Sequence, residues 1–216
     1  MKEERIKAKK IFLAIGALTG WLAILLQLYL IILNRVASVP ETIIRFFSFY
    51  TILTNILVAV FFTVLLLKLN SLWGRFFSQP HIATAIALYI TIVGIVYNVI
   101  LRFLWQPQGL QWIVDELLHT VIPLFFIFYW LIFARKDGLQ WKNIFYWLIY
   151  PFVYIIWILI RGAFSGFYPY PFINVTTLGY SKVLLNSLGL FCVFLLGSVL
   201  FMATAKIISR KQKANT

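Results

Sequence analysis

Residues 110–134 read LQWIVDELLHTVIPLFFIFYWLIFA. Its only charged residues are Asp115 and Glu116, both near its start. A helix of roughly 20 apolar residues, rising about 1.5 Å per residue, crosses the hydrocarbon core of a bilayer. The stretch is therefore long enough and apolar enough to form a transmembrane helix.

The rest of the chain repeats this pattern. Of its 216 residues, 62% are hydrophobic and 19% aromatic, and the mean hydropathy is +0.93. A soluble domain of this length has too little core to hide so much apolar surface. Hydropathy therefore predicts an all-α, polytopic membrane protein that forms one domain over residues 1–216. Its six spans are expected at about 11–34, 43–67, 82–105, 110–134, 142–160 and 183–206.

The basic residues predict the orientation in the membrane, because cytoplasmic connections carry an excess of Lys and Arg. Six spans divide the 19 basic residues into fourteen on the side of both termini and five on the other side. Both termini are therefore expected in the cytoplasm. The larger set is Lys2, Arg5, Lys7, Lys9, Lys10, Lys68, Arg75, Arg135, Lys136, Lys142, Lys206, Arg210, Lys211 and Lys213, and the smaller set is Arg35, Arg45, Arg102, Arg161 and Lys182.

Composition also argues against several partners and cofactors. The net charge of +13 suggests nucleic acid at first, but the basic residues flank the spans, where anionic lipid headgroups attract them. The single cysteine, Cys192, excludes an internal disulfide and a cysteine-built metal site. We expect membrane lipids as partners, no nucleic acid and no cofactor.

Polar side chains gather in one layer of the predicted bundle. Thr51 lies about eight residues into the second span and His119 about nine into the fourth, so both sit about 12–14 Å below the outer surface. Polar groups inside hydrocarbon are costly, so this layer predicts a polar pocket that opens toward the outer leaflet above an apolar plug. Other members of the outer half are Gln27, Asn98, Arg102, Asp115, Glu116, Arg161 and Asn186.

Helical spacing predicts which side chains share a face. Spacings of three and four residues align polar groups on the second, third and fourth spans. The aligned sets are Ser48, Thr51, Thr54 and Asn55, then Asn98 and Arg102, then Asp115, Glu116 and His119.

Pro123 predicts a kink in the fourth span. Proline has no N–H group, so the carbonyl of His119, four residues earlier, loses its helical partner. That carbonyl is then free to hold a water or a hydroxyl group.

Each candidate residue has a second interpretation. A histidine with acids one turn away suits proton transfer, or serves as a structural hydrogen-bond node. Thr51 is a candidate nucleophile, with Thr54 as its rival, although threonine in a membrane helix commonly bonds its own backbone. Glu116-x-x-His119 has the spacing of a carboxylate-bridged metal motif, but a single copy does not predict a di-metal site.

Three short motifs resemble the androgen-induced-gene and androgen-dependent TFPI-regulating protein family of polytopic membrane threonine hydrolases. They are Leu118-His119-Thr120-Val121-Ile122-Pro123-Leu124-Phe125, Phe49-Tyr50-Thr51 followed by Ala59-Val60-Phe61-Phe62, and Tyr170-Pro171-Phe172. The resemblance implies a carboxylic ester hydrolase with a threonine nucleophile and a histidine, acting on fatty acid esters of hydroxy fatty acids. Prokaryotic relatives of similar size imply a prokaryotic cell membrane. Asp115 and Glu116 depart from the family pattern, which leaves a third catalytic member undetermined.

This chemistry assigns roles to the polar layer. His119 would take a proton from Thr51 and pass it to the leaving alcohol. Asp115 or Glu116 would orient the imidazole. An oxyanion would be stabilised by Asn55, Asn98 or backbone donors, and Arg102 would bind a free carboxylate of the substrate.

Two alternatives use the same residues without ester hydrolysis. One is a small transporter or proton-coupled carrier with Arg102, Asp115, Glu116 and His119 as its relay, although the chain shows neither repeated halves nor polar groups through the full depth. The other is a non-catalytic membrane protein that binds lipid.

Overall fold

The computed structural model describes residues 2–67 and 70–214, and the described residues form helices and connections without a strand. Six helical segments are long and apolar enough to cross a membrane, which confirms the predicted class and number of spans. They are α1 (Lys2–Leu33), α3 (Tyr50–Leu67), α5 (Pro80–Val99) with the 3-10 turn η1 (Leu101–Phe103), the segment α6 (Leu110–Glu116), η2 (Leu117–Val121) and α7 (Ile122–Ile132), α8 (Asn143–Ser165), and α9 (Val175–Ala214). Shorter elements are α2 (Val39–Phe46), α4 (Leu72–Phe77) and η3 (Pro171–Ile173).

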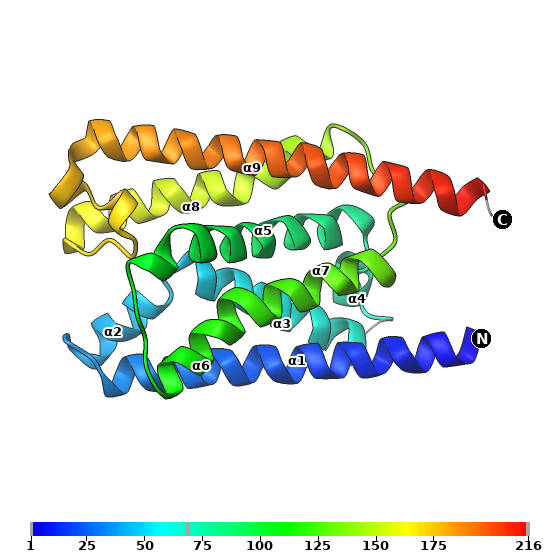
Figure 1. The fold of residues 1–216 in the computed structure, drawn as a ribbon, viewed down its shortest axis with the longest axis horizontal. Helices are drawn as coiled ribbons and strands as arrows, with labels where there is room; N and C mark the ends of the chain where they lie inside the picture. The colour runs from blue at the N-terminus through cyan, green and yellow to red at the C-terminus, as the bar shows by residue number, and fades with distance from the viewer. Residues whose placement is uncertain (1, 68–69, 215–216) are drawn as a thin grey trace.

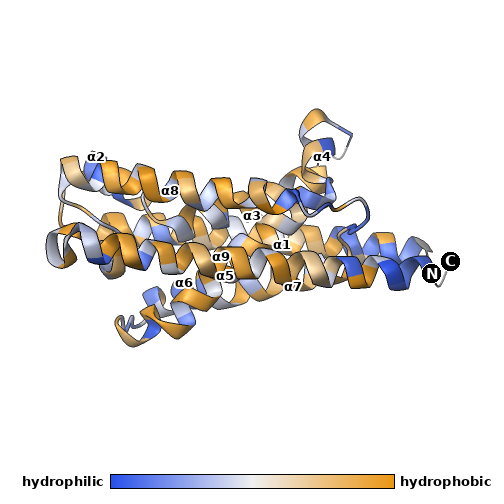
Figure 2. Ribbon diagram, turned by 90° about the horizontal axis from the view of Figure 1, so that it is seen from above, coloured by the Kyte–Doolittle hydropathy of each residue, from blue (hydrophilic) through white to orange (hydrophobic). Residues whose placement is uncertain are grey.

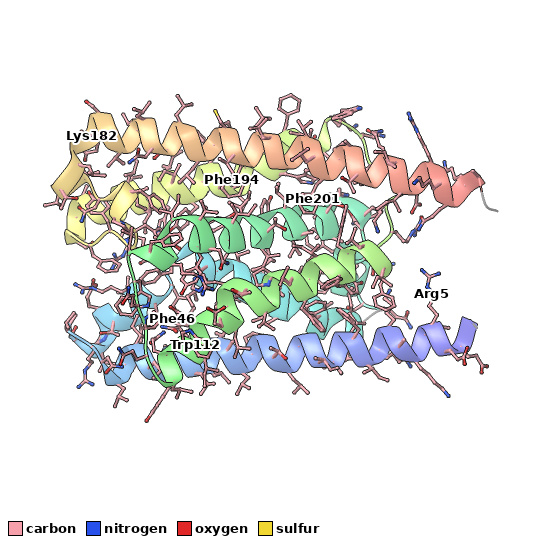
Figure 3. All side chains as sticks on the ribbon, in the orientation of Figure 1. Arg5, Phe46, Trp112, Lys182, Phe194 and Phe201 are labelled. Atoms are coloured by element: carbon pink, nitrogen blue, oxygen red, sulfur yellow. The ribbon has the colours of Figure 1, made fainter. Side chains whose placement is uncertain are left out.

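The helices run alongside one another, with α8 and α9 on one side, α1 on the other and α5 between them (Figure 1). Both termini lie at the same end of the bundle, as an even number of spans requires. Hydrophilic residues are concentrated at that end (Figure 2). Arg5 lies at the terminal end and Lys182 at the opposite end (Figure 3). Lys68, which belongs to the larger basic set, lies outside the described residues.

The predicted second span begins too early. The chain forms a separate helix, α2, and breaks at residues 47–49 before α3 starts at Tyr50. The last turn of α2 closes when the Ser48 N–H bonds the Arg45 carbonyl and the Ser48 hydroxyl bonds the Ile44 carbonyl. Hydropathy does not detect this break because the flanking residues are apolar. Ser48 is therefore not on the α3 face, and the depth of Thr51 cannot be counted from residue 43.

An aromatic core fills the bundle between the polar layer and the terminal end. The rings of Phe61 and Phe62 on α3 meet Phe126 and Tyr129 on α7, with centroids 5.0–5.4 Å apart. Gly20 lets α1 approach α3, because a Cβ there would lie 3.0 Å from the Ala59 side chain. These contacts form the apolar plug that the sequence predicts.

Lys136, a member of the larger basic set, also has a structural role at the end of α7. Its side chain is buried, and its ammonium donates to the carbonyls of Trp130, Leu131 and Ala134 at 2.5, 3.2 and 2.9 Å. The Trp130 and Leu131 carbonyls belong to the last turn of α7, where helical N–H partners run out, and Ala134 follows shortly after the helix. The lysine therefore caps α7.

Candidate functional site

A cavity of about 810 Å³, the large cavity, lies at the end of the bundle opposite the termini, near Phe46 (Figure 3). Thr51 from α3, Asp115 from α6 and His119 from η2 all line it. Gln27, Asn34, Gln106, Gln108 and Gln111 add polar groups. The fold thus brings Thr51 and His119 to one cavity although they come from different spans.

The helix that carries His119 contains a π turn. The Ile122 N–H bonds the Leu117 carbonyl, five residues back, rather than that of Leu118. In a π turn the Leu118 carbonyl would accept from the N–H of residue 123, five residues on. In an α-helix the His119 carbonyl would accept from the same N–H, four residues on. Pro123 has no N–H to offer either of them. The fourth span thus contains a π turn at the predicted position, and the missing N–H of Pro123 leaves two carbonyls without backbone donors.

Two asparagine side chains satisfy these carbonyls. Asn55 on α3 donates to Leu118 O at 3.2 Å and to Thr51 O at 2.9 Å. Asn98 on α5 donates to His119 O at 3.3 Å. An amide thus holds the carbonyl where the sequence predicted a water or hydroxyl. Neither Asn55 nor Asn98 belongs to the described lining of the large cavity. The structure therefore does not bring these two residues to the position of an oxyanion.

A close approach between α5 and η2 makes the Asn98 bond possible. A Cβ on Gly94 would lie 3.2 Å from the His119 carbonyl oxygen and 3.3 Å from the Pro123 ring. Any larger residue at this position would push η2 away from α5.

Substitutions of Asn98 and Pro123, alone and together, test whether the Asn98 amide replaces the backbone donor that Pro123 lacks. Asn98→Leu is expected to lower the free energy of unfolding by about 1–3 kcal/mol, because it leaves a buried carbonyl without a donor. Pro123→Ala restores an N–H, so Asn98→Leu should cost less in that background. Thermal unfolding of the four proteins in one detergent gives the coupling directly. Loss of the other Asn98 contacts is common to both backgrounds and cancels, so equal costs would refute the explanation.

The His119 ring is held from two sides. Its Nδ1 lies 2.9 Å from the Asp115 backbone carbonyl, and its ring stacks on Tyr97 with centroids 3.9 Å apart. A carbonyl only accepts hydrogen bonds, so the proton of the neutral ring belongs on Nδ1. Nε2 is then left as the acceptor, which is the arrangement a general base needs.

Asp115 orients the imidazole mainly through its backbone. Its carboxylate Oδ1 is 4.0 Å from His119 Nδ1, whereas Tyr97, Trp105 and Gln111 donate to the carboxylate at 3.2, 2.9 and 3.4 Å. The carboxyl group is buried rather than wet, and it ties the connection after η1 to α6. Asp115, a predicted third member of a triad, is therefore close to the His119 ring, but its carboxylate is hydrogen-bonded to other side chains.

Glu116 and Arg102 form an ion pair behind the site. Arg102 Nη2 lies 2.6 Å from Glu116 Oε1, and the guanidinium also donates to Asn98 and Thr120 at 3.0 and 3.3 Å. Neither residue is among the described lining of the large cavity. Arg102 is thus occupied, and the structure does not bring it to the position where it would bind a substrate carboxylate.

The Thr51 hydroxyl contacts Tyr170 rather than His119. The Thr51 N–H donates to the Tyr170 hydroxyl at 3.2 Å, and the two hydroxyl oxygens are 3.4 Å apart. Both Thr51 and His119 are described, and no hydrogen bond joins them. Thr54, the rival, is fully buried, bonds Tyr150 at 3.3 Å and is absent from the described cavity linings.

Tyr170 is the site residue that sequence reasoning missed. It comes from the connection between α8 and α9, far from Thr51 in sequence, and it is buried in the large cavity wall. The Tyr170-Pro171-Phe172 turn was a signal of resemblance only, because neither hydropathy nor helical spacing predicts where a connection folds.

The remaining members of the predicted polar layer do not all reach the cavity. Gln27 lines it and accepts a hydrogen bond from Gln111 at 2.9 Å. Asn186 instead donates to the Phe172 carbonyl at 2.8 Å. Arg161 pairs with Glu41 at 2.9 Å.

Glu41 accepts a second guanidinium. Arg45 donates to the same carboxylate oxygen at 2.9 Å, and the guanidiniums of Arg45 and Arg161 lie over the Phe167 ring at 4.6 and 5.1 Å. The hydrogen bond from Arg45, with the nearby charge of Arg161, holds the pKa of Glu41 below its usual value. The cluster joins α2 to α8 and the connection that follows it.

Metal-ligand geometry is not found in the described part of the chain. There, no group of three or more His, Cys, Asp and Glu side chains comes close enough to hold a metal ion. Comparisons of the chain with protein-family models, with curated proteins and with solved structures find no match.

Proposed function

We propose that this protein is an intramembrane lipid ester hydrolase in which Thr51 is the nucleophile and His119 the general base. The observation that supports the proposal most strongly is the meeting of the two residues in one cavity. A hydroxyl from α3 and an imidazole from η2 both line it, and the imidazole is held with Nε2 as its acceptor. An alcohol and a base in one partly enclosed, largely apolar cavity are the minimum for acyl transfer.

The reaction would proceed through an acyl-threonine. Thr51 Oγ1 attacks the ester carbonyl while His119 Nε2 takes the hydroxyl proton, and the carbonyl electron pair moves to oxygen. Collapse of this intermediate breaks the bond to the alcohol, which leaves with the proton from Nε2. Water then attacks the acyl-threonine with the same histidine as base, releasing the fatty acid and restoring Thr51.

Tyr170 is the best-placed donor for the oxyanion. Its hydroxyl accepts the Thr51 N–H, so its own proton remains available for donation. The 3.4 Å contact with Thr51 Oγ1 is long, so the threonine hydroxyl is only weakly held there and would have to leave it to bond the imidazole. The arriving carbonyl oxygen would take the vacated place beside the phenol. Hydrogen bonds of this kind are typically worth about 2.7–4 kcal/mol to an oxyanion.

The membrane orientation is part of the proposal. The distribution of Lys and Arg favours cytoplasmic termini, which would put the large cavity on the outer side of a prokaryotic cell membrane. A substrate would reach it from the outer leaflet. The resemblance of the motifs predicts fatty acid esters of hydroxy fatty acids as the substrate class.

Purified protein in detergent micelles tests the activity. We expect it to release fatty acid from long-chain esters, and His119→Ala to abolish the release while the yield of folded protein is unchanged. Absence of cleavage across a panel of esters would refute the proposal.

Binding without turnover is the second candidate. It is favoured by one observation, that Thr51 contacts Tyr170 and not His119. A lipid that copurifies or binds without cleavage in the same assay would support it.

A further inference from the structure

A second, smaller cavity of about 90 Å³, the small cavity, lies between α3, α5, α8 and α9. It shares Thr51, Leu101 and Tyr170 with the large cavity, so the Thr51 hydroxyl stands at the junction of the two. Its other lining residues are mostly apolar or aromatic: Tyr50, Ile92, Val93, Val96, Pro151, Tyr154, Ile155, Phe172, Ile173, Ser187, Leu190, Phe191 and Phe194.

The small cavity extends toward the middle of the helices. Ile92 and Phe194 are far from the ends of α5 and α9, and Phe194 appears partway along α9 in Figure 3. An apolar chain placed there would follow the bundle inward from Thr51. Its surroundings would be mostly apolar.

The large cavity is also largely apolar, but its lining carries more polar groups than that of the small cavity. Asn, Gln and His side chains supply most of these groups, and Asp115 is the only Asp or Glu in the described lining. No Lys or Arg belongs to its lining as far as the chain is described. Three arginines of the same half of the bundle are held in ion pairs, Arg102 with Glu116, and Arg45 and Arg161 with Glu41.

We infer that the substrate is an uncharged lipid ester whose acyl chain enters the small cavity with its first carbons and whose neutral, polar alcohol portion occupies the large cavity. The inference rests on the proposed hydrolase function, and it replaces the substrate class that the motif resemblance predicts with a neutral one. We call the small cavity and the large cavity the two arms of the site. The position of Thr51 at their junction places the ester carbon between them. The acyl portion remains on Thr51 after the alcohol leaves, so the apolar arm belongs to the acid.

The charged groups around the large cavity disfavour a substrate with a free carboxylate. Such a group would enter a partly dehydrated cavity beside Asp115 without a cation to pair with it. Burying an unpaired anion near another acid is unfavourable both by desolvation and by repulsion. Fatty acid esters of hydroxy fatty acids, which the motif resemblance predicts, carry that carboxylate. The cavity instead favours esters of glycerol-like or other uncharged hydroxylated alcohols.

A matched pair of substrates tests the charge. One is a palmitoyl ester of a hydroxy fatty acid, and the other is the same molecule with its carboxylate reduced to a primary alcohol. We expect the neutral compound to have a kcat/KM at least about tenfold higher. Asp115→Asn should narrow this ratio, which is measured within each variant and so is independent of any general loss of activity. Equal rates, or preference for the acid, would overturn the inference.

Two cavity-filling variants test the arms. Val96→Phe fills the small cavity and should reduce activity on palmitoyl relative to butyryl esters about tenfold. Ile31→Phe narrows the large cavity and serves as the matched control. It should leave the acyl-length ratio unchanged while it discriminates against bulky alcohols. If both variants shift the acyl-length ratio alike, the two arms are not separate.

A binding measurement separates this inference from the hydrolase proposal. A non-cleavable ether analogue with a diazirine at the end of its acyl-equivalent chain is photocrosslinked to the protein, and the site is mapped by mass spectrometry. We expect crosslinks on α5, α8 or α9 near the small cavity, with stronger competition from the neutral alcohol than from the acid. Crosslinks with no hydrolysis of any ester would refute the enzyme and retain the two-arm site. Crosslinks confined to α1 and α2 would refute the arms.

Discussion

Thr51→Ala and His119→Ala are each expected to reduce ester turnover by at least about a thousandfold. Thr51 supplies the atom that bonds to the acyl carbon, and His119 removes its proton, so neither step has a substitute in the described lining of the large cavity. The two residues act as a unit, and the double variant should therefore be about as inactive as either single one. Single-turnover release of fatty acid measures the effect on the acylation step.

Thr54→Ala is the matched control for Thr51→Ala. Thr54 lies one turn away on the same helix, and its hydroxyl bonds Tyr150 rather than reaching a cavity. It should retain turnover within a few-fold of the unmodified protein. A large loss in Thr54→Ala, with turnover kept in Thr51→Ala, would exchange the two threonines in the mechanism.

Tyr170→Phe is expected to lower kcat by about a hundredfold with little change in KM. The substitution removes only the hydroxyl that contacts both the Thr51 N–H and Thr51 Oγ1, and the effect of losing one oxyanion donor is of this size. A donor that acts on the transition state changes kcat, whereas a residue that merely shapes the cavity would change KM.

Tyr150→Phe is the corresponding control, because it removes a hydroxyl that contacts Thr54. Both tyrosines are partly or fully buried, so both variants test the general cost of losing a phenol. Thermal unfolding of the two proteins should therefore be similar while their turnover differs. Equal turnover would mean that Tyr170 has a structural role only.

The sequence predicts the helical class and the six spans because those depend on hydropathy summed over long stretches. The end of α2 and the start of α3 depend on a few hydrogen bonds near Ser48, which hydropathy does not register. Pro123 predicted a break, because its missing N–H is a property of one residue. The π turn that it produced depends on how η2 packs against α3 and α5.

The sequence predicts the polar layer, but it does not predict which of its residues line the cavity and which join helices. Gln27, Thr51, Asp115 and His119 reach the large cavity, whereas other polar residues hold helices together. Asn55 and Asn98 replace missing backbone donors, and Arg102 neutralises Glu116. The partner of a polar side chain depends on tertiary contacts, and helical spacing gives only the direction in which it leaves its own helix. Tyr170 was missed for the same reason.

Reaction with a long-chain fluorophosphonate, followed by mass spectrometry of the intact protein and of its peptides, is the sharpest test of the main claim of the hydrolase proposal. The claim is that the Thr51 hydroxyl is activated by His119 within their shared cavity. We predict one adduct per chain, located on Thr51 and lost in His119→Ala. An adduct on Thr54 or another hydroxyl, or labelling of Thr51 that persists without the imidazole, would contradict it.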